Sequence, residues 1–295
     1  MAGTTTTLTE GIREAFAPGF EDEVYHQSSL IPLFPPPEDS AGDTAYRWKI
    51  HITGNSSVEL YSEGGSQAAP GNQAYTHAAV DYLAFRFMTQ ITGHARAALR
   101  SRWFGAIEEE QTLGQADLID LINTTYMAST YGLENAIAAT GTYGGITRGS
   151  VTYFESKVTA VGDVIASTDI QDMLEALKDN DIGVVPNLLI GPVNQETNIY
   201  RLTPDAGMRI TDYQNPLPNF QNQRVAGMQP AFLGDWTDTV LCFLRREHVH
   251  IIQHQPFQVK EMAPSGDSDV TQNSYMGVIV HKRPHLAGKL TGCTA

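Results

Sequence analysis

The sequence predicts an α+β fold in which strands and helices occur in separate blocks along the chain. Apolar and polar residues alternate over 46–52, which is the period of a strand with one face in water. Apolar residues recur at a spacing of three to four between 95 and 139, which is typical of a long helix. Three β runs follow, at 239–244, 249–253 and 276–282. Because strands and helices do not alternate regularly, a parallel α/β sheet is disfavoured.

The composition of the 295 residues is that of a folded protein, with 41% hydrophobic and 18% charged residues. The formal net charge of -14 argues against binding nucleic acid through its phosphates, which requires clustered Lys and Arg. Two cysteines, Cys242 and Cys293, form no disulfide framework and fit a reducing cytoplasm. The N-terminus carries no secretion signal, and no run approaches the roughly 20 apolar residues that cross a bilayer. We therefore expect a protein that is made in the cytoplasm and has no membrane contact.

The first 45 residues differ in charge from the rest of the chain. They hold one base, Arg13, and eight acids: Glu10, Glu14, Glu21, Asp22, Glu23, Glu38, Asp39 and Asp43. Their apolar residues show no lasting period, and three consecutive prolines at 35–37 stop any helix. Such a segment is either a solvated tail or a strap on a complementary surface. Because it is too acidic and broken to form a core of its own, we expect neighbouring subunits to hold it.

Residues 46–92 are predicted to form a long two-stranded hairpin. The strand at 46–52 leads into turn residues at 53–57, and 63–72 is rich in Gly, Ser and Gln. The run 79–87 then returns as the second strand. An isolated hairpin is marginally stable in water, so we expect this one to lie on another molecule.

Two helices are predicted after the hairpin. The first has an apolar stripe and ends in the Gly-rich stretch 141–145; its stripe is Leu113, Leu118, Leu121, Ile122, Thr125 and Tyr126. The second begins at Thr168, which forms a capping-box pair with Gln171. Its buried face comprises Ile170, Met173, Leu174 and Leu177.

Three histidines are the best candidates for chemistry. His248 and His250 would share one face of a strand, and with His254 they could ligate a metal. The competing interpretation, the polar face of an exposed strand, is the one we favour, so we predict no metal and no cofactor. The sequence has no Gly-x-Ser-x-Gly, Cys-x-x-Cys or His-Glu-x-x-His motif, and 141–145 lacks the Gly-Lys-Ser/Thr of a phosphate loop. No catalytic residue is nominated, and we expect that the chain is not an enzyme.

The order of these segments resembles the major capsid proteins of tailed bacteriophages, which have the Hong Kong 97-type fold. The local matches are the Glu-Gly pair at 63–64, the small-residue end of the long helix at 135–141, and Gly234-Asp235 before a β run. The resemblance implies five parts. They are an N-terminal arm (1–45), an extended loop (46–92), the first part of a peripheral domain with the spine helix (93–167), mainly an axial domain (168–235), and closing strands of the peripheral domain with the C-terminus (236–295).

The resemblance also implies a function. The chain would self-assemble into hexamers and pentamers of an icosahedral head that encloses double-stranded DNA without sequence-specific binding. It would be part of the virion, assemble in the bacterial cytoplasm, and act with portal, separate scaffolding and decoration proteins. Contacts between subunits are expected at Phe16, Phe20, Leu33, Phe34, Trp48, Glu63, Tyr82 and Phe85. Lys49 is the only lysine in the loop and lies near its base, so we expect no covalent crosslink there.

Two alternatives stay open. The first is the shell subunit of an encapsulin-type compartment, which has the same fold and packages proteins. The second is a metal-binding β protein or an enzyme that uses the face of His248, His250 and His254.

Overall fold

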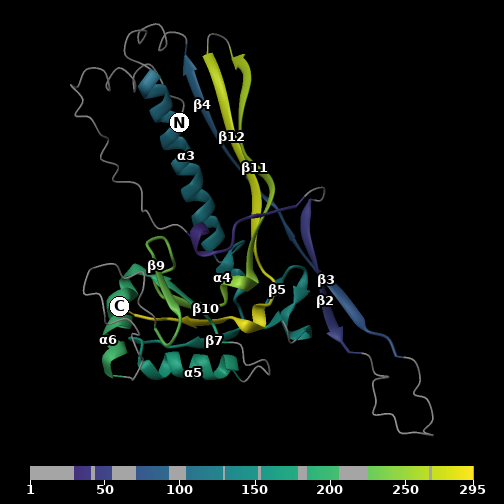
Figure 1. Cartoon of the computed structure of the whole chain (residues 1–295), viewed down its shortest axis with the longest axis vertical. Coiled ribbons are helices and arrows are strands. Elements are labelled where there is room, and N and C mark those ends of the chain that lie inside the picture. The colour runs from purple at the N-terminus through teal and green to yellow at the C-terminus, as the bar shows by residue number, and fades with distance from the viewer. Residues whose placement is uncertain are drawn as a thin grey trace.

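The computed structural model describes residues 30–40, 44–54, 71–92, 104–128, 130–151, 154–178, 185–205, 225–265 and 268–294. Within them the chain forms two larger sheets and two small ones, together with helices on both sides of the five-stranded sheet and along one side of the four-stranded sheet (Figure 1). The predicted α+β fold is confirmed. None of the described helices is both long and apolar enough to span a membrane.

The four-stranded sheet has the order β1-β11-β12-β4 and carries the long helix α3 (Phe104–Met127) along one face. Its strands are β1 (Glu38–Asp39), β4 (Leu83–Thr92), β11 (Val249–Ser265) and β12 (Ser268–His281). Side chains alternate along β4, so Phe85 and Thr89 are buried toward the helix while Arg86 and Met88 are exposed on the other face.

The predicted stripe of the long helix is correct for Leu118, Ile122 and Tyr126, which are buried in the main core. It is wrong for Leu121, which is exposed. The helix also ends earlier than predicted, at Met127, and a short helix α4 (Leu133–Ala136) follows. Gly132 marks the break, because its backbone lies against the last turn of α3: a Cβ at this position would come 2.3 Å from the carbonyl oxygen of Tyr126.

The Gly-rich stretch forms a tight hairpin. Strands β5 (Thr142–Tyr143) and β6 (Ile146–Thr147) pair antiparallel, with Gly144 and Gly145 between them at φ of 58° and 76°. Positive φ at both central residues is the geometry of a two-residue hairpin turn, which glycine adopts without strain. This stretch is therefore a hairpin turn, and the helix before it has already ended.

The five-stranded sheet has the order β7-β13-β10-β8-β9 and separates two cores. Its strands are β7 (Lys157–Ala160), β8 (Leu188–Pro192), β9 (Gln229–Leu233), β10 (Val240–Leu244) and β13 (Gly288–Thr291). Every residue of β8 and β10 is buried. In β10, Cys242 and Leu244 face the main core, whereas Leu241 and Phe243 face the core under α5 (Ser167–Lys178). This explains why the strand reads as a continuous apolar run.

Helix α5 buries the predicted face of Ile170, Met173, Leu174 and Leu177. The predicted capping pair, Thr168 with Gln171, is wrong, because the observed pair lies two residues earlier in the sequence. The backbone N–H of Ala166 donates to Oδ2 of Asp169 at 2.8 Å, so Asp169, and not Gln171, reaches back to the N-terminus. The nearby helix α6 (Glu196–Asp205), which buries Ile199 in the same core, was not predicted.

The hairpin is shorter than predicted. Strand β2 (Ala45–Thr53) pairs with β3 (Ala74–Asp81), but the expected return strand 79–87 divides at Tyr82, and β4 continues into the four-stranded sheet. The grouping of the last strands also needs correction. Strands β10 and β13 belong to the five-stranded sheet with β8 and β9, so they do not close the sheet of β11 and β12.

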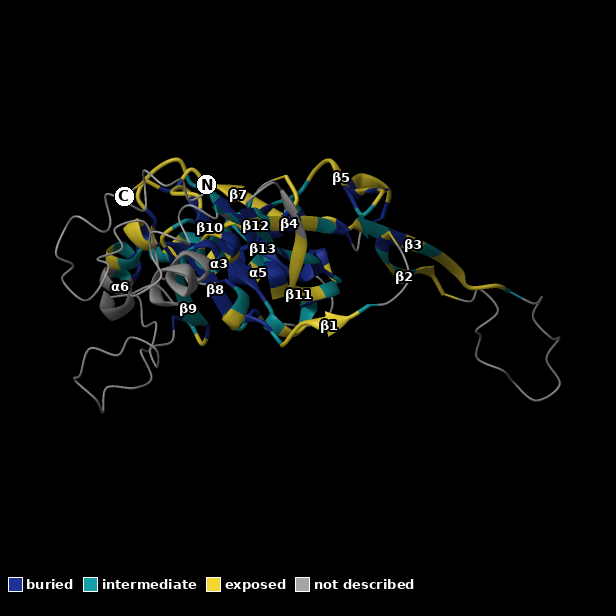
Figure 2. Cartoon of the chain, turned by 90° about the horizontal axis from the view of Figure 1, so that it is seen from above, coloured by how far each residue is buried: buried dark blue, intermediate teal, exposed yellow. Residues whose placement is uncertain are grey.

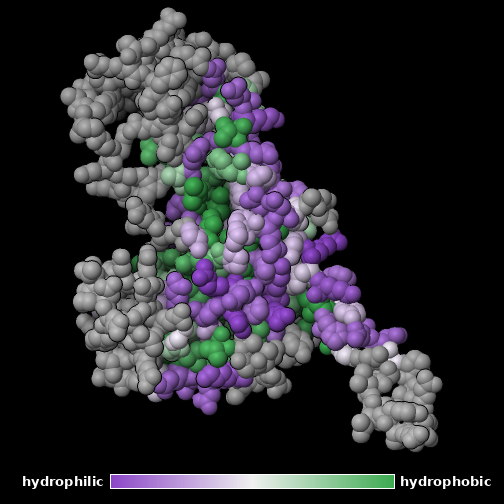
Figure 3. Space-filling model, viewed as in Figure 1, coloured by the Kyte–Doolittle hydropathy of each residue, from purple (hydrophilic) through white to green (hydrophobic). Residues whose placement is uncertain are grey.

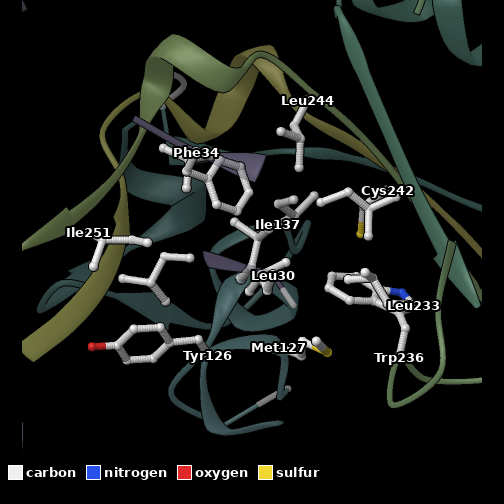
Figure 4. Close-up of a cluster of buried hydrophobic side chains, with 14 of the residues drawn as sticks. Leu30, Phe34, Tyr126, Met127, Ile137, Leu233, Trp236, Cys242, Leu244 and Ile251 are labelled. Atoms are coloured by element: carbon white, nitrogen blue, oxygen red, sulfur yellow. The ribbon is translucent and has the colours of Figure 1, made fainter. Parts of the chain in front are cut away.

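The described part of the N-terminal segment is held by the chain itself. Leu30 and Phe34 flank the 3-10 helix η1 (Ile31–Leu33) and are buried in the main core beside Tyr126, Met127 and Ile137 (Figure 4). Strand β1 then pairs parallel with β11. The expectation that neighbours hold this segment is therefore wrong for 30–40, while residues 1–29 lie outside the described residues.

Candidate assembly surfaces

The residues expected at subunit contacts occupy different places in the structure. Phe34, Tyr82 and Phe85 are buried within the chain. The ring of Phe85 packs against Tyr126 and Tyr275, with centroid distances of 6.1 Å and 6.2 Å. These three side chains stabilise the chain's own fold, which leaves them little surface for a neighbour.

Tyr82 joins the N-terminal segment to the sheet. Its hydroxyl donates to Oγ of Ser40 at 2.8 Å, and its ring stacks on His254 at 4.9 Å between centroids. Leu33 is half-buried against the main core. Phe16, Phe20 and Glu63 lie outside the described residues, so their expected role stays a prediction.

Trp48 fastens the base of the hairpin to the body. Its ring stacks on Phe154 and on Tyr46, at centroid distances of 6.3 Å and 5.9 Å. A backbone hydrogen bond from the N–H of Ala79 to the carbonyl of Gly144, at 2.9 Å, holds the second strand. The base is thus part of the chain's own core.

The far end of the hairpin has no such support from the described residues. It projects from the body, and exposed residues follow one another toward its end (Figure 2). Ile52 and Tyr75 are 38% and 44% exposed, and the ammonium group of Lys49 lies 3.8 Å from the centroid of the Tyr75 ring. Two strands with both faces in water gain little from burial. This end is therefore a candidate contact surface.

The three candidate metal ligands do not come together. His250 Nδ1 lies 2.5 Å from Oε1 of Glu38, and His254 Nδ1 lies 3.1 Å from the carbonyl oxygen of Ser40. His248 lies in the 3-10 helix η6 (Arg246–His248), so the expectation that it shares a strand face with His250 is wrong. No group of three or more His, Cys, Asp or Glu side chains suited to a metal occurs among the described residues.

Glu38 anchors strand β1 electrostatically. It pairs with His250, and the ammonium group of Lys282 lies 3.5 Å from its other oxygen. Partial burial raises the pKa of this carboxyl, but the hydrogen bond and charge of His250 and the charge of Lys282 outweigh burial and hold the pKa below its usual value.

His281, which is buried, and His248, which is half-buried, have ring centroids 6.4 Å apart. Burial lowers the pKa of His281 to about 3, and the neighbouring His248 and His285 add to this shift. Burial also lowers the pKa of His248 to about 4, together with the charge of Arg283. Both rings are therefore uncharged at neutral pH, and His281 is buried as a neutral group.

Sequence reasoning missed Arg148, which is only 1% exposed. Its guanidinium donates to the carbonyl oxygens of Thr140, at 2.8 Å, and Ala136, at 3.2 Å, and to that of Asn135. It thereby joins α4 and the segment that follows it to the end of the β5–β6 hairpin. Burial lowers the pKa of this guanidinium. A single Arg in a loop carries no periodic signal, so nothing in the sequence pointed to this role.

No protein-family model matches the sequence, and no curated protein matches it. Solved structures do match. A chain of the cyanophage A-1(L) capsid asymmetric unit is 16% identical, with 97% of this chain and 98% of that chain covered and a TM-score of 0.70. A chain of the native GTA particle capsid is 10% identical, with 95% of both chains covered and a TM-score of 0.66.

The mature capsid of bacteriophage PhiM1 contributes a third match, at 12% identity and a TM-score of 0.62, with 94% of this chain and 91% of that chain covered. The chain has the Hong Kong 97-type fold of phage capsid proteins. Since the alignments span almost the full length of both chains, the capsid fold includes both the projecting hairpin and the two larger sheets. Each of these similar chains is part of an assembled capsid.

Proposed function

We propose that the chain is the major capsid protein of a tailed bacteriophage, which self-assembles into hexamers and pentamers of an icosahedral head around double-stranded DNA. The observation that carries the proposal is the exposed far end of the β2–β3 hairpin, with Ile52 and Tyr75 in water, on a chain with a phage capsid fold. Burial of these side chains against a neighbouring copy would stabilise both molecules.

We keep the five parts that the resemblance to phage capsid proteins implies, with changed boundaries. We assign the extended loop to 45–81, because β4 belongs to the four-stranded sheet. The four-stranded sheet with α3 would be the peripheral domain, with α3 as its spine helix. The five-stranded sheet with α5 and α6 would be the axial domain, including β10 and β13. Residues 1–29, which lie outside the described residues, would belong to the N-terminal arm.

The proposed role is structural. The shell would enclose DNA by shape, because a net charge of -14 gives no basis for tight phosphate contacts. The protein would reside in the virion and assemble in the bacterial cytoplasm. Portal, scaffolding and decoration proteins are the further partners that we expect.

Electron microscopy of particles that contain this chain, with analysis of their contents, tests the proposal. We expect icosahedral heads filled with double-stranded DNA that nuclease degrades only after the particles are opened. Small particles filled with protein would overturn the phage function in favour of a protein compartment with the same fold.

A further inference from the structure

The face of the four-stranded sheet opposite α3 has two different halves. Near the middle of the molecule the base of the hairpin covers it, where Tyr46, Trp48 and Val80 pack on a cluster that includes Ile252 and Val278. Beyond this cluster, the strands β4, β12 and β11 continue, and the side chains of Arg86, Met88 and Lys260 on that face are exposed. Hydrophilic residues gather along the β11 and β12 side of the molecule (Figure 3).

The open half carries a shallow groove across the three strands. Its lining includes Arg86, Gln258, Lys260, Gln272, Ser274 and Met276. Ladder pairing places these side chains in rows on one face, because Ser274 lies between Arg86 and Gln258, and Gln272 lies between Met88 and Lys260. Phe85 and Thr89, the alternate residues of β4, are buried toward α3.

The groove is positively charged. Arg86 and Lys260 are both exposed, and neither forms an ion pair with another described residue. Among the described residues, no acidic side chain lines the groove. Two exposed methionines extend the same face, Met88 at 43% and Met262 at 38% exposure. A partner that fits this surface combines negative charge with a few apolar side chains.

One segment of the chain has this composition. Residues 10–24 carry the acids Glu10, Glu14, Glu21, Asp22 and Glu23 and the apolar residues Ile12, Phe16, Phe20 and Val24, with Arg13 as the only base. The three consecutive acids at 21–23 are complementary in charge to Arg86 and Lys260. The rings of Phe16 and Phe20 are suited to contact with the exposed methionines.

The connection of this segment to the body favours a second copy. Leu30, where the described chain begins, is fully buried beside Tyr126 and Met127, on the α3 side of the sheet. The described chain therefore begins on the face of the sheet opposite the groove. We infer that the groove between Arg86 and Lys260 binds the acidic segment 10–24 of a neighbouring copy. This inference rests on the proposed self-assembly and names one of its contacts.

Photo-crosslinking in assembled particles tests the inference. The photoreactive residue p-benzoylphenylalanine replaces Gln258, which lines the groove, and the particles contain equal amounts of ¹⁵N-labelled and unlabelled chains. We expect a crosslink to a peptide within 1–29 of a differently labelled chain. The inference would be overturned, and the shell function left intact, by any of four results. These are a crosslink to 55–70, a crosslink to nucleic acid, a crosslink only within one chain, and no crosslink. If the unmodified chain forms no particles, the proposed function itself fails.

Charge reversal gives the second arm of the test. Arg86→Glu together with Lys260→Glu should lower the crosslink yield about tenfold, because two exposed charge pairs become repulsive. Reversing 21–23 in the same chain (Glu21→Lys, Asp22→Lys, Glu23→Lys) should restore the yield. Lys178→Glu is the matched control, since Lys178 is an exposed cation at the end of α5, far from the groove (Figure 1). An unchanged yield in the doubly reversed groove would contradict the charge match.

Discussion

The ring of Phe87 in β4 lies directly against the backbone of Gly114 in α3, where a Cβ would come within 1.9 Å of a ring carbon. Glycine inside a helix costs about 1 kcal/mol relative to alanine. Its presence here is explained by the close approach of the helix to the sheet, which lets the Phe87 ring contact the helix backbone. Residues 27 positions apart thereby fix how α3 lies on β4.

Replacing Gly114 with Ala should destabilise the fold even though alanine is the better helix former. The added methyl group has no room unless the Phe87 ring moves, and overpacking of this kind costs about 1–3 kcal/mol. Urea denaturation measures the change in the free energy of unfolding. Gly149→Ala is the control, because no atom lies within 4 Å of a Cβ there. In a Phe87→Ala background the Gly114→Ala cost should disappear; an equal cost in both backgrounds would show that the ring is not its cause.

Arg148→Met should lower the free energy of unfolding by about 3–5 kcal/mol, because it removes the donors of three carbonyl groups in a buried site. Arg148→Lys should recover only part of the loss, since an ammonium group cannot reproduce the planar fork. Thermal and urea unfolding of the two variants provide the comparison. A Met variant as stable as the parent would refute the role assigned to the guanidinium.

Acid should weaken the fold through His281, which is buried, and its half-buried neighbour His248. Their folded pKa values of about 3 (His281) and about 4 (His248) lie below the unfolded value near 6.5, so the unfolded state binds more protons below that pH. The contribution of these rings to stability is fully present above pH 6.5 and falls as the pH drops toward 4. The fall is up to about 1.4 kcal/mol per pH unit for the buried His281 and smaller for the half-buried His248, whose charge water screens.

Unfolding free energies measured between pH 7 and pH 4 test this dependence. His281→Leu should reduce the slope with little loss at pH 7, because neither ring nitrogen of His281 has a hydrogen-bond partner among the described residues. A slope unchanged by this substitution would assign the acid sensitivity to other groups.

Charge at the far end of the hairpin should prevent assembly and leave the fold intact. We expect Ile52→Lys with Tyr75→Lys to unfold at the parent's urea midpoint, since both side chains are exposed, but to raise the concentration needed for assembly at least about tenfold. Light scattering against concentration gives that threshold. Val193→Lys, at another exposed apolar residue, is the control. Normal shells from the hairpin variant would exclude this end from the interface.

The elements with strong local patterns were predictable. Helix α5 buries the four residues that its period selects, and β2 follows its alternation closely. Strands β11 and β12 run far beyond the predicted β runs, because their outer parts are rich in Gln, Ser and Asn and lie on an open face. Register shifts near Gln255 and Gln258 also disturb the alternation on which such a prediction depends.

The candidate contacts were harder to predict, because they depended on where the hairpin ends. Tyr82 and Phe85 were selected as residues of a free loop, but the chain changes sheets at Tyr82, and both side chains enter the core. No local signal marks that change: 79–87 alternates as one strand would. Arg148 likewise has partners that only the folded backbone brings within reach.

We expect this chain to assemble with copies of itself through its exposed hairpin. The most direct measurement is the mass of the purified chain by multi-angle light scattering over a range of concentrations, with electron microscopy of the same samples. We expect species of five or six times the 32.2 kDa chain mass, and closed shells built from them. A species that stays at the mass of a single chain at every concentration would contradict it.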